Sequence, residues 1–241
     1  MVGVILAAGD GKRIQNSCDE YFCKPLIKIN GKALIEYSFD NFSELKINKV
    51  YVVVGKSREL IKSAIGEKYG NINIQYVFQE EQKGLINAFV QALQAIPDEE
   101  DVILQLSDEI FFDFKTNAVK RAIETASYDF FCGITVEENE EKIKNNFSVE
   151  FEDNFVIKGC TEKPDVVVNK IKGTGFCFFD SQCVLFLKSK YDEKTNTLNN
   201  LCDYMDLLIK ENKKGLALHI ADKEFNINTL SDLVEASNYL K

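Results

Sequence analysis

Strands and helices alternate along the first half of this 241-residue chain, and that alternation restricts the fold more than any other feature. Short apolar runs indicate buried strands, and segments with apolar residues every three or four positions indicate amphipathic helices. We expect strands at 2–8, 26–29, 49–55, 72–78 and 101–106, and helices at 33–45, 57–69 and 84–96, with Ser57 capping the second helix. This order favours a parallel sheet with helices on both faces, which binds ligands beyond the carboxyl ends of its strands.

The second half has a different pattern, in which several strands follow one another. The expected strands are 128–136, 147–152, 155–160, 175–179 and 216–221, and the expected helices are 182–190, 199–212 and one that starts near residue 230. The Asp153-Asn154 turn between two of these strands indicates an antiparallel pair. We therefore predict a Rossmann-like α/β fold with three α/β/α layers, a mixed but mostly parallel sheet and a small antiparallel β lobe. No linker or repeat interrupts the sequence, so we expect one domain over residues 1–241.

Charge and cysteine content exclude several classes of protein. The net charge of −9 argues against nucleic acid and anionic membranes as partners, because proteins that bind them are usually basic. No apolar run approaches the roughly 18 residues of a membrane span, and the N-terminus reads as a strand rather than a targeting segment. The seven cysteines lack a Cys-x-x-Cys pair and accompany a single histidine, His219. We expect buried free thiols in a reducing cytoplasm, without structural zinc or Cys-His catalysis.

A glycine-containing loop, residues 9–13, follows the first apolar run. Two glycines spaced by one residue allow a sharp turn and a close approach to a ligand, and consecutive backbone N–H groups can cradle an anion. Lys12, Arg13 and Lys24 add positive charge, so this stretch predicts a site for a polyphosphate. An ordinary glycine turn is the alternative. The dinucleotide fingerprint would need a third glycine where Ile14 stands, and the Walker A pattern is absent as well.

The run Leu-Ala-Ala-Gly-Asp-Gly-Lys-Arg at residues 6–13, followed by Lys24-Pro25-Leu26, resembles the opening signature of the sugar-phosphate nucleotidyltransferases. The chain departs at Lys12, where that family usually has a small hydroxyl residue. The resemblance implies the nucleotide-diphospho-sugar transferase fold, with a nucleotide-binding half at about 1–125 and an acceptor-binding half at about 126–241. It also implies that Arg13 steadies the leaving pyrophosphate and that Lys24 neutralises the triphosphate. The residues it implies in nucleotide binding are Leu6, Ala7, Ala8, Gly9, Gly11, Lys12, Gln79 and Gly84.

Asp108 follows the apolar run 102–106 and so lies at the carboxyl end of a predicted strand. A carboxylate that faces a triphosphate repels it unless a divalent cation lies between them, and Mg²⁺, which prefers oxygen ligands, suits that role. Residues 106–111, Leu-Ser-Asp-Glu-Ile-Phe, resemble the Leu-Gly-Asp-Asn-Ile-Phe of glucose-1-phosphate thymidylyltransferases, in which the aspartate binds metal. A turn or capping aspartate is the alternative.

Gln79 and Gly84 belong to a segment, 79–89, that resembles the Gln-x(4)-Gly-Leu-Ala-x-Ala pattern of the same family. There the glutamine amide and the glycine backbone read the nucleotide base, which is a pyrimidine in the thymidylyl- and uridylyltransferases. An amide offers a donor and an acceptor, which suits the edge of a base. Without the resemblance, a surface glutamine ahead of a helix would be the default interpretation.

Glu162-Lys163-Pro164 resembles the Glu-Lys-Pro motif of the family, although this tripeptide alone is common on protein surfaces. The resemblance implies that Lys163 holds the acceptor phosphate and that Glu162 accepts hydrogen bonds from sugar hydroxyls. A fixed cation offsets the repulsion between two anions that react. Thr174 lies in a stretch similar to the one that closes over the sugar. Asn146 stands where the family has a glycine that approaches the sugar, which leaves the identity of the acceptor open.

Residues 225–233 match a motif whose first aspartate is the second metal ligand of the family, and Asn226 replaces it here. The run Asn-Ile-Asn-Thr at residues 226–229 also resembles molybdenum-cofactor guanylyltransferase-like proteins. An amide oxygen can bind Mg²⁺, with lower affinity because it lacks the charge. Either Asn226 or Asn228 could join Asp108 at the metal, and Asn228 or Thr229 could also cap the last helix.

These motifs together imply transfer of a nucleoside monophosphate from an NTP, with UTP, dTTP or CTP favoured, to a sugar 1-phosphate, with Mg²⁺ as cofactor and pyrophosphate as product. In-line attack by the acceptor phosphate needs positioning and charge stabilisation and little general base catalysis. One alternative is a non-catalytic nucleotide-sugar-binding regulatory protein, suggested by Lys12, Asn146 and Asn226. Another is a cytidylyltransferase acting on a non-sugar phosphate such as phosphocholine, and a nicotinamide-dependent dehydrogenase is more remote. The oligomeric state is left open, and a homo-oligomer is compatible with the sequence.

Overall fold

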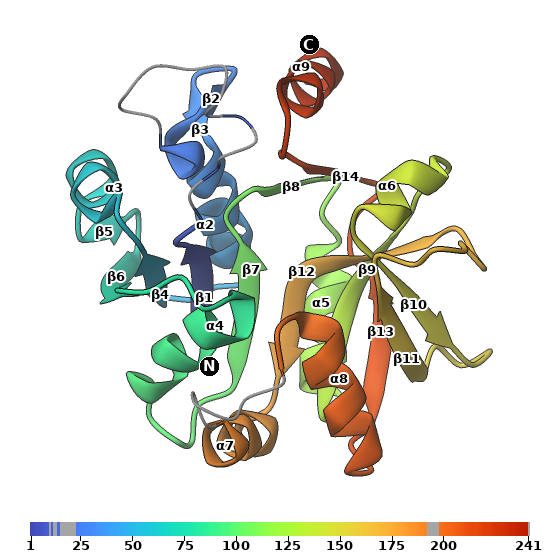
Figure 1. Cartoon of the computed structure of the whole chain (residues 1–241). Coiled ribbons are helices and arrows are strands. Elements are labelled where there is room, and N and C mark those ends of the chain that lie inside the picture. Colours follow the sequence, from blue (N-terminus) through green and yellow to red (C-terminus); the bar gives the residue numbers. More distant parts are fainter. Residues whose placement is uncertain (10, 12–13, 15–22, 192–197, 241) are drawn as a thin grey trace.

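The computed structural model describes residues 1–9, 11, 14, 23–191 and 198–240 (Figure 1). The strands of its main sheet are β1 (Val2–Ala7), β4 (Lys49–Val54), β5 (Lys68–Tyr69), β6 (Ile72–Phe78), β7 (Val102–Leu106), β9 (Phe130–Val136), β10 (Phe147–Phe151), β11 (Ile157–Glu162), β12 (Ile171–Phe179) and β13 (Gly215–His219). Two ribbons pair β2 (Lys28–Ile29) with β3 (Lys32–Ala33), and β8 (Glu109–Phe112) with β14 (Lys223–Asn226). The helices are α2 (Leu34–Glu44), α3 (Arg58–Ile65), α4 (Leu85–Gln94), α5 (Thr116–Glu124), α6 (Glu140–Lys144), α7 (Ser181–Lys190), α8 (Leu201–Lys210) and α9 (Leu230–Tyr239), with a 3₁₀ turn η1 (Lys24–Leu26).

The main sheet runs through both halves of the chain. Its order is β11-β10-β12-β7-β1-β4-β6-β5, and β9 pairs with β12 and β13. Strands β7, β1, β4 and β6 are parallel, which confirms the parallel sheet predicted for the first half. Strand β12 is antiparallel to β7 and β9, and β10 is antiparallel to β11 across the Asp153-Asn154 turn, which confirms the mixed sheet and its antiparallel lobe.

Alternate residues of the central strands face two hydrophobic cores. On β1, Val4 and Leu6 pack into the core formed with α4, α7 and α8, whereas Ile5 and Ala7 pack into the core formed with α2, α3 and α5. Burial on both faces explains why β1 and β4 are continuous apolar runs rather than alternating ones. The three-layer α/β/α arrangement is therefore confirmed. A smaller cluster packs the β8–β14 ribbon against α9.

Several predicted boundaries are wrong for identifiable reasons. The helix predicted at 57–69 ends at Ile65 because Gly66 adopts a φ of 80°, and Lys68–Tyr69 then forms the edge strand β5. Ser57 precedes α3 without a side-chain capping hydrogen bond. Residues 24–26 form the 3₁₀ turn, so only β2 remains of the strand predicted at 26–29. The sequence pattern does not predict β8, β14, α5 or α6.

The described cysteines are Cys23, Cys132, Cys160, Cys177, Cys183 and Cys202, and all six are buried and free of disulfides. Burial raises the pKa of the Cys183 thiol, and the nearby Asp180 carboxylate raises it further. Such thiols are poor nucleophiles, because the thiolate is the reactive form. Among the helices in the described part of the chain, none combines the length and the apolar character needed to cross a membrane.

Candidate functional site

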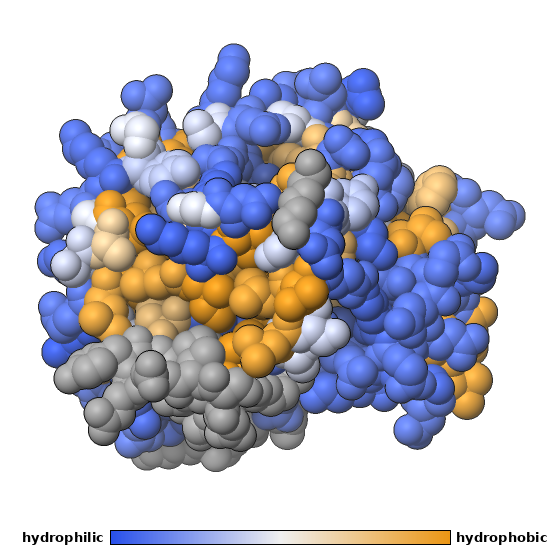
Figure 2. Space-filling view, turned by 90° about the horizontal axis from the view of Figure 1, so that it is seen from above, coloured by the Kyte–Doolittle hydropathy of each residue, from blue (hydrophilic) through white to orange (hydrophobic). Residues whose placement is uncertain are grey.

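A pocket of about 500 Å³ opens beyond the carboxyl ends of β1 and β7, where parallel sheets bind their ligands. Seen from above in Figure 2, this side of the molecule carries a band of hydrophobic side chains bordered by hydrophilic ones. The predicted site residues that line the pocket are Leu6, Ala8, Gly9, Gly11, Lys24, Gln79, Gly84, Asp108 and Asn228. The structure therefore brings together five separate segments of the sequence.

The backbone after β1 forms one wall of this pocket. Gly11 has a φ of 62°, a conformation that favours glycine, and its carbonyl oxygen accepts a hydrogen bond of 3.0 Å from the Ile14 N–H. Gly55 follows β4, and a Cβ added there would lie 2.8 Å from the carbonyl oxygen of Ala8. The loop is thus held against the neighbouring strand at a distance that only glycine permits.

Two of the predicted contacts are buried away from the pocket. Ala7 lies in the core between the sheet and α2, and Thr174 is fully buried on β12. The Thr174 hydroxyl donates a hydrogen bond of 2.9 Å to the Gly133 carbonyl oxygen, so it joins two strands of the sheet. Lys12 and Arg13 lie outside the described residues, and their contacts with phosphates stay predictions.

Lys24 lies where two oxygen ligands converge. Its ammonium donates one hydrogen bond to Asp108 Oδ2 and a second, of 3.1 Å, to Asn228 Oδ1. Lys24 begins the 3₁₀ turn η1, and Asp108 lies in the turn between β7 and β8. The side chains of Lys24 and Asp108 are only 10% and 24% exposed, so the attraction between their charges is less screened than at the surface.

A chain of amides continues from Asn228 across the site. Asn228 Nδ2 donates to Asn226 Oδ1 at 2.6 Å, and Asn226 Nδ2 donates to Asn146 Oδ1 at 2.9 Å. The Asn146 carbonyl oxygen then accepts a hydrogen bond of 2.7 Å from the Lys163 backbone N–H. These contacts bring the predicted metal ligands and two predicted acceptor contacts into one continuous network.

Gln79 lies at the opposite side of the pocket, ahead of α4, and is only 4% exposed. Its Nε2 donates a hydrogen bond of 2.9 Å to Asn87 Oδ1 and lies 3.5 Å from the Gly84 carbonyl oxygen. Gln82 Nε2 donates to the Ala8 carbonyl oxygen at 2.6 Å, which ties this segment to the end of β1. The motifs do not single out Gln82 or Asn87, and the one clue in the sequence is that both residues lie close to Gln79.

Glu162 is the last residue of strand β11, on the predicted acceptor side, and Lys163 follows it. Desolvation raises the pKa of the Glu162 carboxyl, the Lys163 charge lowers it and the Asp203 charge raises it, with a net shift upward. Lys163 has a φ of 46°, an uncommon conformation for a residue with a side chain. In this conformation the Lys163 N–H donates a hydrogen bond to the Asn146 carbonyl oxygen, just beyond the end of the strand.

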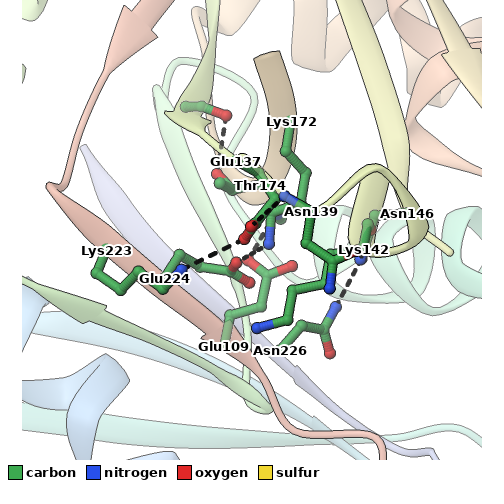
Figure 3. A network of polar contacts seen from close by, with 12 residues as sticks. Glu109, Glu137, Asn139, Lys142, Asn146, Lys172, Thr174, Lys223, Glu224 and Asn226 are labelled. Carbon is green, nitrogen blue, oxygen red and sulfur yellow. Dashed lines mark hydrogen bonds and ion pairs between the residues drawn. The ribbon is translucent and has the colours of Figure 1, made fainter. Parts of the chain in front are cut away.

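A buried charge network, formed by Lys172, Glu224, Glu109, Lys223 and Glu137, lies close to the asparagines (Figure 3). Lys172 pairs with Glu224, and the side chains are 3% and 1% exposed. Burial alone would lower the pKa of Lys172, but the charge and hydrogen bond of Glu224 raise it overall. Burial raises the pKa of Glu109, and the charges of Glu224 and Asp108 add to this effect. In the sequence, the clue to this network is Lys172, a charged residue within the otherwise uncharged strand β12.

Asp108 and Asn228 form a donor set that fits a divalent cation. Their oxygens converge on the Lys24 ammonium, which shows that the geometry accommodates a positive charge. One carboxylate with amide oxygens suits Mg²⁺, which binds few protein ligands and keeps several waters. Asn226 Oδ1 instead accepts a hydrogen bond from Asn228, so Asn228 lies nearer to the Asp108 carboxylate along the network.

Parallel strands that end at a glycine loop and at a carboxylate place the molecule in the class of nucleotide-binding α/β proteins. Within that class, the chain belongs to the family described as Nucleotidyl transferase, which it matches over residues 2–241. The resemblance noted from the sequence is thereby confirmed.

Two curated relatives illustrate this membership. The UTP–glucose-1-phosphate uridylyltransferase AglF of Haloferax volcanii is 29% identical over 246 residues, a match that covers 100% of this chain and 97% of that protein. The bifunctional protein GlmU of Caldicellulosiruptor saccharolyticus is 28% identical over 250 residues and is matched over 51% of its length. The chain thus spans nearly the whole of the first relative and about half of the second.

Solved structures confirm the nucleotide-diphospho-sugar transferase fold. A UDP-glucose pyrophosphorylase complexed with UDP-glucose has a TM-score of 0.83 at 19% identity, covering 100% of this chain and 98% of that chain. An inositol-1-phosphate CTP transferase from T. maritima has a TM-score of 0.80 at 16% identity, covering 98% and 93%. At these identities the likeness concerns the fold.

Proposed function

We propose that this protein transfers the nucleoside monophosphate of UTP, dTTP or CTP to a sugar 1-phosphate and releases pyrophosphate. The observation that supports this best is the network from Lys24 and Asp108 through the asparagines to the Lys163 backbone. It places a cation and a carboxylate beside the glycine loop and links them to the predicted acceptor contacts. The relative from Haloferax volcanii suggests UTP and glucose 1-phosphate as the first substrates to test.

The reaction joins an acceptor phosphate oxygen to the α-phosphorus while the bond to pyrophosphate breaks. Both reactants are anions, so the principal demand on the protein is positioning and charge neutralisation. Lys24 supplies a fixed positive charge inside the pocket, and in this proposal Gly9 and Gly11, which line the pocket, bind the polyphosphate through their backbone. In this proposal Arg13 steadies the leaving pyrophosphate, and Lys163 with Glu162 holds the acceptor.

Members of this kind of enzyme generally use a divalent metal, and we propose Mg²⁺ held by Asp108 with Asn228 or Asn226. When bound, it would neutralise phosphate charge at the α-phosphoryl group. Asn146 and Asn226 orient the Asn228 amide through their hydrogen bonds, which keeps its oxygen directed toward Asp108 and Lys24. We also propose a cytoplasmic location, because buried free thiols persist in a reducing compartment.

Pyrophosphate release tests the proposal directly. Each NTP is combined with a panel of sugar 1-phosphates and phosphocholine in the presence of Mg²⁺, with wild-type protein and Asp108→Asn. The matched control is Asp222→Asn, which makes the same change in the exposed Lys115–Asp222 pair on the protein surface. We expect release with one substrate pair, loss of release in Asp108→Asn and wild-type release in the control.

Other outcomes identify the alternatives. Release with CTP and phosphocholine, but with no sugar phosphate, would identify a cytidylyltransferase for a non-sugar acceptor. Nucleotide binding by calorimetry without any pyrophosphate release would refute catalysis and leave a nucleotide-sugar sensor.

A further inference from the structure

The Gln79 amide has a defined orientation although it lies at a ligand pocket. The Gly84 carbonyl oxygen, 3.5 Å from Nε2, can only accept hydrogen bonds. The Gln79 side chain must therefore turn its NH₂ group toward Gly84 and Asn87, because its own oxygen would be repelled there. Gln79 is 4% exposed, so solvent contributes little to the choice between the two orientations.

Two further residues hold this orientation from behind. Asn87, on α4, is 3% exposed, and its Oδ1 accepts from Gln79 Nε2 at 2.9 Å and from Gln91 Nε2 at 3.0 Å. Asn87 Nδ2 donates a hydrogen bond of 2.9 Å to the hydroxyl of Tyr191, which follows α7. A relay thus runs from the end of α7 through α4 to the pocket. This relay holds the Asn87 side chain in place, whereas the Gly84 carbonyl oxygen sets the direction of the Gln79 amide, because the Tyr191 hydroxyl can donate or accept.

The oxygen of Gln79 is the atom left for a ligand. Within the described ranges, the hydrogen bonds of the Gln79 side chain all use Nε2, while Oε1 accepts none from the protein. Gln79 lines the pocket, so Oε1 is available to accept a hydrogen bond from a ligand that supplies an N–H.

We propose that Asn87 and Tyr191 are positioning residues that present Gln79 Oε1 to the base and so select uracil or thymine over cytosine. This inference rests on the proposed function. In a uridine or thymidine nucleotide the only N–H of the base is at N3, whereas N3 of cytosine is a bare acceptor. Cytosine in the same pose would bring two acceptors face to face, and a buried polar mismatch of this kind discriminates strongly.

The ratio of kcat/KM for UTP to kcat/KM for CTP measures the selection. We expect wild-type protein to prefer UTP, and Asn87→Leu to reduce the ratio at least tenfold. Tyr191→Phe removes one hydrogen bond from the relay and should reduce the ratio about threefold. Asn87→Asp should retain the preference, because a carboxylate still accepts from Gln79 and from the Tyr191 hydroxyl. Gln91→Leu is the matched control, since it removes a hydrogen bond to the same Asn87 oxygen without a contact to Gln79.

A purely structural role would change the melting temperature and the two kcat/KM values together and leave their ratio unchanged. An unchanged ratio in both Asn87→Leu and Tyr191→Phe would overturn the relay, and a wild-type preference for CTP would overturn the orientation. If no NTP releases pyrophosphate, the proposed function fails, and calorimetric Kd values of UDP and CDP test the relay separately. We then expect the ratio of the Kd for CDP to the Kd for UDP to follow the same order among the variants. Equal affinities of the wild-type protein for both nucleotides would refute the relay.

Discussion

Replacing Lys172 by methionine should destabilise the protein strongly, because it isolates buried carboxylates. The side chains of Lys172 and Glu224 are almost fully buried, and the Lys172 ammonium donates directly to Glu224. Glu109 also lies close enough to influence the pKa of Lys172. Methionine keeps much of the side-chain volume, so the change removes charge and hydrogen bonding more than packing.

The expected loss follows from the burial of the partner. Removing one member of a buried ion pair lowers the free energy of unfolding by about 3–5 kcal/mol, since the other charge stays without compensation. For a chain of this size each kcal/mol lowers Tm by about 2–4 °C, which gives a decrease of about 6–20 °C. The raised pKa of Lys172 means that its contribution is complete below its unfolded pKa and is lost as pH rises through the folded pKa. The difference in Tm should therefore shrink in alkaline solution, where the wild-type ammonium loses its proton.

Thermal unfolding followed by circular dichroism measures this difference. Lys170→Met is the matched control, because it removes a lysine from the exposed Lys170–Glu138 pair just before the same strand, and it should lower stability by less than about 1 kcal/mol. The double variant Lys172→Met/Glu224→Leu should recover at least half of the loss. If Lys172→Met unfolds at the same temperature as Lys170→Met, the reasoning about the buried pair is refuted.

Four further predictions concern the site and its supports. Asp232→Ala removes the acceptor of two backbone N–H groups at the start of α9 and should lower stability by about 1 kcal/mol in urea unfolding. Burial raises the pKa of Tyr76 to about 12, so its hydroxyl should stay protonated in the folded protein up to about pH 12, and part of the stability should be lost as pH rises from 10 to 12; absorbance at 295 nm against Tyr76→Phe checks this. Gly55→Ala puts a Cβ against the Ala8 carbonyl oxygen and should weaken UTP binding measured by calorimetry at least threefold. Arg13→Ala should lower kcat well over tenfold, because a group aimed at developing charge contributes about 2–4 kcal/mol, and an unchanged kcat would remove Arg13 from the mechanism.

Most of the fold could be predicted from the sequence because buried strands and helix faces require apolar residues in recognisable patterns. Strands β1, β4 and β7 are mostly buried and read as short apolar runs, and β6, parallel to β4, alternates between buried and exposed residues over its first half. The missed strands β8 and β14 alternate little and carry buried charges at Glu109 and Glu224, which a hydropathy pattern assigns to the surface. Their pairing depends on contacts between distant segments, which local periodicity does not encode.

Site residues could be predicted where one continuous segment carries the motif. They could not be predicted where their role depends on contacts between distant segments. The glycine loop, Gln79 and Asp108 line the pocket as the motifs indicated. Thr174 belongs to a motif too, yet its hydroxyl is used within the sheet. The roles of Asn87 and Tyr191 depend on packing between α4 and the end of α7, and this geometry exists only after folding.

The β8–β14 ribbon completes the site with residues from near the end of the chain. Residue Glu109 pairs with Asn226, and the Ile227 N–H donates to the Asp108 carbonyl oxygen at 2.9 Å. The ribosome releases β14 long after β8 has emerged, so Asn226 and Asn228 can reach the Asp108 turn only after nearly the whole chain has been synthesised.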